Sequence, residues 1–294
     1  MRKYKGILQT TALLVTLSFT GFKPAAQIFV QPTVTDESWS RAYKPFRIAG
    51  NLYYVGTDEL ACYLITTPQG HILINTGLAE SVPMIKANVS ALGFKMSDIR
   101  ILLTTQAHYD HVGGMAEIKR ITGATMMVDE KDAPVLADGG NSDYVIGGKG
   151  SIFAPVKTDR LLHDHDTIRL GGMQIIVLHH PGHTKGSCSY LFDVKDDNRS
   201  YRMLIANMPS LLDATNLHGM PTYPDVGKDY AYTLNAMKHL QFDLWVSSHA
   251  SQFGLHQKRS QDDGYRPEAF ADRRGYDSSL NVLQQAYLKR LDRK

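Results

Sequence analysis

The sequence predicts an α/β protein, organised as a four-layer αβ/βα sandwich with two pseudo-equivalent halves. Apolar strand-like runs alternate with helix-like segments, and the order strands, helix, strand, helix occurs twice. Glycine and proline turns separate these segments. The segments richest in histidine directly follow apolar strands, where loops of α/β proteins usually carry a site.

The composition is typical of a globular protein large enough to bury a substantial core. The chain has 294 residues, of which 43% are hydrophobic and 21% charged. The net charge of +3 is dispersed, and no basic stripe with interleaved aromatic residues is present. A nucleic-acid partner is therefore not expected.

The N-terminus has the pattern of a secretory signal. Arg2, Lys3 and Lys5 precede an apolar, uncharged run over residues 6–22, and small residues follow at 24–26. An uncleaved anchor is the alternative, but this run is shorter than the about 20 residues of a membrane-spanning helix. We expect residues 1–26 to be a cleaved signal peptide. Residues 27–294 then form a single domain in the periplasm, as a monomer without stable membrane association.

The first half begins with an irregular arm over residues 28–45. Strands are expected at 52–55, 62–67, 72–75, 99–104 and 125–128. Helices are expected at 81–92, 115–122 and, as one or two turns, 130–137. The glycine-rich segment 138–155 predicts a long loop, either a gate over a site or a disordered connector.

The second half repeats the pattern. Strands are expected at 166–170, 174–178, 187–193, 201–206 and 244–247, with a long loop over 208–226. Helices are expected at 229–240, 267–273 and 278–291. The two cysteines, Cys62 and Cys188, each lie in an apolar run, which leaves a disulfide or two buried free thiols as alternatives.

Potential metal ligands gather in three segments. His108, Asp110 and His111 share one loop, His183 lies in a Pro-Gly-His-Thr-Lys-Gly-Ser turn, and His249 ends a strand. Imidazole and carboxylate are zinc ligands. With an amide from Gln106, these groups suffice for two three-ligand sites that each keep a position open for water, as catalytic zinc sites do.

The motifs also carry a resemblance. Thr-Thr-Gln-Ala-His-Tyr-Asp-His and Pro-Gly-His-Thr-Lys-Gly-Ser resemble the two signatures of the metallo-β-lactamase superfamily, and the resemblance extends from Trp39 to the last helix. His111 and the absence of a Cys ligand after residues 201–206 indicate the third subclass, B3. Asn207 stands where many relatives have a bridging Asp. Gln106, in place of the first His ligand, indicates the GOB-type branch.

The resemblance implies an enzyme with zinc as cofactor, one or two ions per chain, and a zinc-bound hydroxide that attacks the β-lactam amide. Asp110 would also be catalytic, by orienting that hydroxide. The implied ligands are Gln106, His108 and His183 for the first zinc and Asp110, His111 and His249 for the second. Since an amide oxygen is a weaker zinc ligand than imidazole, we expect the second site to be the tighter one.

The resemblance also implies substrate-binding residues. Ser210 is expected to hold the substrate carboxylate, Met208 to form an apolar wall, and Trp39 and Phe153 to flank the groove. For Trp39, an anchor for the arm is the competing interpretation. Lys185 either attracts the carboxylate or is a solvated turn residue.

The leading hypothesis is an exported zinc β-lactamase that hydrolyses penicillins, cephalosporins and carbapenems and so confers β-lactam resistance. A lactonase or thioesterase of the same superfamily, acting on acyl homoserine lactones or thioesters, is the second hypothesis. A non-catalytic periplasmic zinc-binding protein is the third, and it requires a closed four-ligand site.

Overall fold

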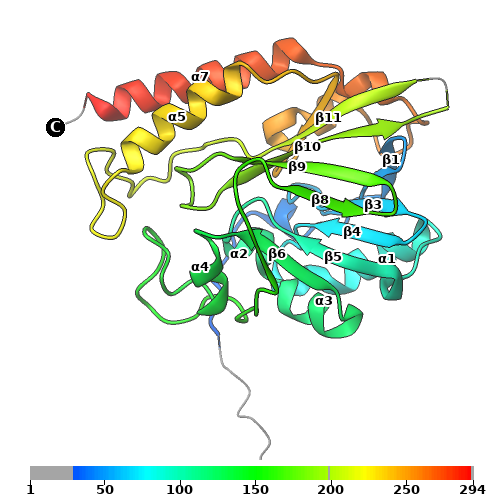
Figure 1. Ribbon diagram of the computed structural model, residues 1–294, viewed down its shortest axis with the longest axis horizontal. Helices are drawn as coiled ribbons and strands as arrows, with labels where there is room; N and C mark the ends of the chain where they lie inside the picture. The colour runs from blue at the N-terminus through cyan, green and yellow to red at the C-terminus, as the bar shows by residue number, and fades with distance from the viewer. Residues whose placement is uncertain (1–28, 198, 293–294) are drawn as a thin grey trace, which may run out of the picture.

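The structure is a computed structural model that describes residues 29–197 and 199–292. Two β-sheets pack face to face, and helices cover their outer faces (Figure 1). The predicted fold class is thereby confirmed. The predicted signal, residues 1–26, lies outside the described residues. Within the described part of the chain, no helix is both long and apolar enough to cross a membrane.

The first sheet has seven strands in sequence order. They are β1 (Phe46–Ala49), β2 (Leu52–Tyr54), β3 (Tyr63–Thr67), β4 (Gly70–Ile74), β5 (Ile99–Leu103), β6 (Thr125–Asp129) and β7 (Arg160–Leu162). Strands β1 to β4 pair antiparallel, and β4 to β7 pair parallel. Helices α1 (Val82–Ala91) and α3 (Met115–Thr122) lie between the parallel strands in sequence, as crossover connections require.

Side-chain alternation divides the residues of this sheet between two cores. Tyr63 and Ile72 face the second sheet, whereas Leu64 and Leu73 join the core that includes helices α1 and α3. The segment between β6 and β7 contains the short helix α4 (Ala133–Ala137) and the glycine-rich loop.

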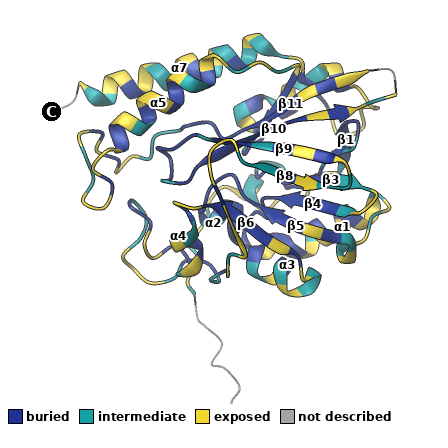
Figure 2. Ribbon diagram, viewed as in Figure 1, coloured by how far each residue is buried: buried dark blue, intermediate teal, exposed yellow. Residues whose placement is uncertain are grey.

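The second sheet has five strands in the order β12-β11-β10-β9-β8. They are β8 (Thr167–Leu170), β9 (Met173–His179), β10 (Cys188–Lys195), β11 (Ser200–Ala206) and β12 (Leu244–Ser247). Helices α5 (Val226–Lys238) and α7 (Arg273–Leu291) form the other outer layer (Figure 1). Figure 2 shows that the strands are mostly buried, while α5 and α7 alternate between buried and exposed residues.

Several element boundaries differ from the sequence predictions. Strand β1 lies where no strand was predicted, because Arg47 interrupts its apolar run, although its other residues are buried. The helix predicted at 267–273 is a short 3-10 turn, Pro267–Phe270, and α7 begins at Arg273, where the Asp272 side chain caps it. Cys62 and Cys188 are both buried free thiols, which decides that alternative.

Candidate metal centre

The predicted ligands meet at one edge of the two sheets, which is formed by the loops after strands β5, β9 and β12. Gln106, His108, Asp110 and His111 follow the end of β5, His183 follows β9, and His249 follows β12. An isolated antiparallel bridge between Leu60 and His249 joins the two halves at this edge. Ligand candidates that lie far apart in the sequence are therefore brought together by the docking of the sheets.

The loop after β5 is shaped by one helical turn, α2 (Tyr109–Val112). His108 stands before it in extended conformation and lies beside His183, whereas Asp110 and His111 lie beside His249. The carbonyl of His111 accepts hydrogen bonds from the backbone N–H and the hydroxyl of Thr76, at 2.7 and 3.1 Å. The turn that carries the ligands is thus fixed to the end of β4.

Asp132 connects this loop to the turn that carries His183. Its carboxylate accepts hydrogen bonds from Ala107 N (2.9 Å), Thr184 Oγ1 (2.7 Å) and Gly186 N (2.7 Å). A Cβ atom on Gly186 would lie 2.5 Å from the Asp132 backbone nitrogen, so this approach requires glycine. Asp132 was not predicted from the sequence, because no spacing rule links it to either motif.

Asp110, His111 and His249 form a compact group whose ligand atoms all lie within 4.8 Å of one another. Asp110 Oδ2 is 3.1 Å from His111 Nε2 and 3.3 Å from His249 Nε2. His111 Nε2 is buried and makes no hydrogen bond, despite its short distance to Asp110. An unpartnered imidazole nitrogen beside a carboxylate and a second imidazole fits a zinc ion.

The electrostatics of this group favour a cation. Burial by itself raises the pKa of Asp110, but His111 and His249 hold that pKa well below its usual range. Burial lowers the pKa of His249, yet its contacts with Asp110 and Glu59 raise it to about 9. Two carboxylates around one imidazole therefore create a field that stabilises positive charge.

Gln106, His108 and His183 are all buried, and the two histidines lie close together. The His108 and His183 rings are 4.9 Å apart between centroids. His183 Nδ1 donates to the Ser210 carbonyl at 2.7 Å, which leaves Nε2 available as a ligand atom. Burial, reinforced by His108, lowers the pKa of His183 to about 3, so this imidazole is neutral. The set fits a second zinc ion, with the Gln106 amide oxygen as its weakest donor.

Two carboxylates behind the ligands were missed by the sequence prediction. Asp143 Oδ2 lies 3.1 Å from His108 Nε2, and both side chains are buried. Glu59 Oε1 lies 3.4 Å from His249 Nδ1. Carboxylates at these positions orient ligand histidines and select the nitrogen that faces a metal. Asp143 comes from the glycine-rich loop, so this loop packs directly on the site.

The residues predicted to bind substrate have different environments. The half-buried Trp39 ring lies 5.8 Å from the His249 ring, beside the proposed metal site. Ser210 is half-buried behind His183, and Met208, which is buried, lines a pocket of about 280 Å³ with it. Phe153 is 0% exposed and belongs to the core with α4, so this geometry gives no support to its predicted role beside the groove. Lys185 stacks over the Tyr223 ring at 5.7 Å.

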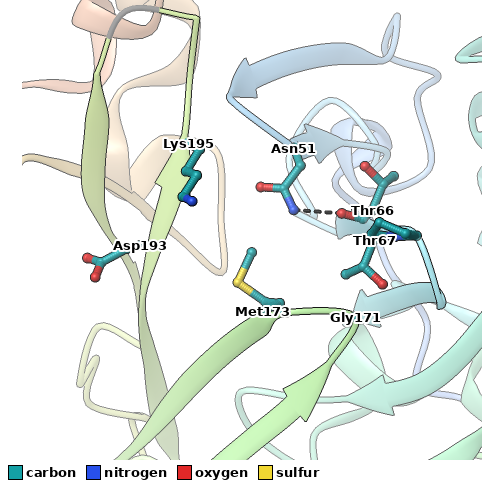
Figure 3. A pocket seen from close by; sticks show the side chains of 9 residues that line it. Asn51, Thr66, Thr67, Gly171, Met173, Asp193 and Lys195 are labelled. Carbon is teal, nitrogen blue, oxygen red and sulfur yellow. Dashed lines mark hydrogen bonds between the residues drawn. The ribbon is translucent and has the colours of Figure 1, made fainter.

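A separate pocket of about 380 Å³ lies at the opposite edge of the sheets (Figure 3). It is bordered by the turn after β3, the turn before β9 and the end of β10, and Asn51, Met173 and Lys195 line it. None of the proposed metal ligands borders this pocket.

Comparison with protein families and solved structures gives consistent results. The profile of the "Metallo-beta-lactamase superfamily" matches residues 56–196. Among curated proteins, the chain is 31% identical over 137 residues to a hydroxyacylglutathione hydrolase of Rhodopseudomonas palustris (strain BisB5). That match covers 47% of this chain and 44% of the relative, so the chain spans less than half the length of such relatives.

Solved structures match over almost their whole length. A beta-lactamase from Chitinophaga pinensis is 63% identical, with a TM-score of 0.88, over 90% of this chain and 99% of that one. The class B3 di-zinc metallo-beta-lactamase LRA-12 from an Alaskan soil metagenome is 62% identical, with a TM-score of 0.88, over 90% and 100%. The metallo-beta-lactamase GOB-18 from Elizabethkingia meningoseptica is 52% identical, with a TM-score of 0.90, over 92% and 100%.

Proposed function

Since the chain belongs to the metallo-β-lactamase superfamily, within the group of its class B3 enzymes, we propose that it hydrolyses β-lactam antibiotics with zinc. Penicillins, cephalosporins and carbapenems are the proposed substrates, and resistance to them is the biological result. The observation that carries the proposal is the buried group Asp110, His111 and His249, which keeps an unpartnered imidazole nitrogen for a metal ion.

Two zinc sites are proposed, as predicted from the sequence. The first would be held by Gln106, His108 and His183, and the second by Asp110, His111 and His249. Bound zinc supplies Lewis acidity and lowers the pKa of a water molecule to about 7. The second site is proposed to be the tighter one, because all its ligands are imidazole or carboxylate.

The protein side chains orient the reactants. Ionised Asp110 accepts a hydrogen bond from the attacking water and so directs its oxygen at the lactam carbonyl carbon. The new C–O bond forms, the ring C–N bond breaks, and the ring nitrogen receives a proton from the attacking water. Trp39 supplies an apolar wall beside His249, and Ser210 is proposed to hold the substrate carboxylate.

Turnover of a chromogenic cephalosporin by the purified protein tests this proposal. We expect zinc-dependent hydrolysis that a chelator abolishes and added zinc restores. Stoichiometric zinc binding without turnover of any β-lactam would refute the proposed activity. Parallel assays on an acyl homoserine lactone and on S-lactoylglutathione, a thioester, separate the competing hydrolase hypothesis. Comparable rates on those substrates would assign the site to another reaction of the superfamily.

We further propose that the protein is exported through a signal over residues 1–26 and acts in the periplasm as a monomer. The intact mass of the protein from a periplasmic fraction should equal the mass of a chain that begins at Gln27. Size-exclusion chromatography with light scattering should give the mass of one chain. A full-length chain in the cytoplasmic fraction, or a dimer mass, contradicts the corresponding part of the proposal.

A further inference from the structure

A chain of buried polar side chains runs beneath the ligand loops and ends on Gln106. Asn207, directly after β11, donates from Nδ2 to Gln106 Oε1 at 3.3 Å. Its own carbonyl oxygen accepts from Ser248 Oγ at 3.2 Å. Gln106 is 3% and Asn207 2% exposed, so water does not compete for these contacts.

A backbone group orients the amide at the other end of this hydrogen-bond chain. Thr105 N–H donates to Asn75 Oδ1 at 3.0 Å, which turns the Asn75 amide nitrogen toward Thr105 Oγ1 at 3.2 Å. Thr105 Oγ1 then lies 2.9 Å from Ser248 Oγ, which donates to Asn207. Asn75 itself holds the left-handed backbone conformation with φ +62°, so a strained residue anchors the chain. Ser248 and Asn207 thus donate in turn toward Gln106.

We infer that Asn207 is a positioning residue that presents the Gln106 amide oxygen to the first metal site. This inference rests on the proposed zinc sites. An amide can bind zinc only through its oxygen, which has two lone pairs. Asn207 occupies one lone pair and fixes the amide plane, and the other lone pair remains for the metal. A carboxylate at residue 207 would only accept, and would therefore draw Gln106 Nε2 toward itself and turn the oxygen away.

The test is a double-mutant cycle read by metal affinity. Purified metal-free protein is titrated with cobalt(II) chloride, and the visible spectrum reports the second equivalent, which enters the first site. In Asn207→Ala, the second equivalent should bind roughly tenfold more weakly, the lower end for loss of a group that orients a ligand. In a Gln106→Ala background, Asn207→Ala should cause no further loss, because Asn207 acts through Gln106.

Asn88 provides a matched control for buried asparagine. It lies in helix α1, is 7% exposed and donates to the carbonyls of Tyr43, Val55 and Gly56, none of which is a proposed ligand. Asn88→Ala should lower the melting temperature and leave the affinity for the second equivalent unchanged. If Asn207→Ala does not fold, Asn207→Ser retains a polar group toward Ser248 and carries the same expectation.

The outcomes separate this inference from the proposed function. Unchanged or stronger binding of the second equivalent in Asn207→Ala overturns the positioning role, and so does an equal loss in the Gln106→Ala background. A wild-type protein that binds no cobalt at all overturns the proposed metal sites instead. In Asn207→Asp, the carboxylate would accept a hydrogen bond from Gln106 Nε2 and turn the amide oxygen away. This variant should therefore change the cobalt spectrum of the second equivalent when Gln106 is present.

Discussion

Among the six proposed zinc ligands, Gln106 is neutral and holds the weakest donor atom. At limiting zinc we expect the metal to occupy the group Asp110, His111 and His249, and this form to retain activity. Gln106→His should strengthen the first site by at least roughly tenfold, since imidazole replaces an amide oxygen. Zinc titration against a chromophoric chelator measures both affinities, and cobalt spectra identify the site.

A matched control is Gln69→His, in an exposed turn at the opposite edge of the first sheet. It should change neither affinity. Filling of the His108–His183 site before the other one contradicts the expected order of occupancy.

The role of Asp143 can be tested by a single substitution. Burial by itself raises its pKa, but His108 lowers it to about 2, so the group is ionised when it faces His108 Nε2. Asp143→Asn should weaken metal binding at the first site by roughly 10- to 100-fold and leave the second site nearly unchanged. The exposed Asp213→Asn is the control. Equal losses at both sites would indicate general disruption rather than orientation of His108.

The proposed ligands could be selected from the sequence, but the groups behind them could not, for a physical reason. His108, Asp110 and His111 lie within four positions, and zinc chemistry demands such clustering. Asp143 and Glu59 reach histidines far along the chain, and their approach depends on how the loops pack. Phe153, in contrast, was predicted from the sequence to flank the groove, but the packing of the glycine-rich loop buries it in the core.

At the scale of elements, Asp132 joins the start of α4 to both ligand loops. Asp132→Asn replaces one of its acceptors by a donor, and should lower the free energy of unfolding by about 1–3 kcal/mol at neutral pH. Urea unfolding of the metal-free proteins, followed by circular dichroism, measures the difference.

The same pair of proteins should show a pH dependence. Burial raises the pKa of Asp132 from 3.8 to about 6. The folded state therefore retains a proton that the unfolded state releases, and the contribution of Asp132 to stability falls as pH rises through this window. The stability difference between wild type and Asp132→Asn should thus widen as pH falls from about 6 to about 4. A constant difference would show that the carboxylate does not titrate there.

The boundaries of helices and strands could be predicted where the apolar periodicity was strong. They could not be predicted where tertiary contacts determine where an element begins or ends. The strands β3 to β5 and β9 to β12 emerged from apolar runs. Strand β7 has two exposed residues out of three, and its pairing with β6 alone makes it a strand. The start of α7 depends on the Asp272 cap, which accepts from Gly275 N and has no hydrophobic signal.

At the scale of the whole molecule, metal removal should lower stability. Ligands that bind the folded state raise its unfolding free energy by about 2.7 kcal/mol at a concentration of one hundred times Kd. We expect the melting temperature to fall after chelation and to recover with zinc, in step with β-lactam turnover. A melting temperature that does not respond to zinc would contradict this expectation. The variant His111→Ala, which lacks one proposed ligand of the second site, should show a smaller response.

The docking of two halves at the ligand edge has a consequence for assembly. One metal ion held by His111 and His249 would be a reversible cross-link that closes about half of the chain into a ring, much as a disulfide does. Its stabilising effect would then come partly from restricting the unfolded chain, and it forms only after the sheets have met. Metal loading would accordingly follow the packing of the two sheets, whose shared apolar core holds the halves together without the metal.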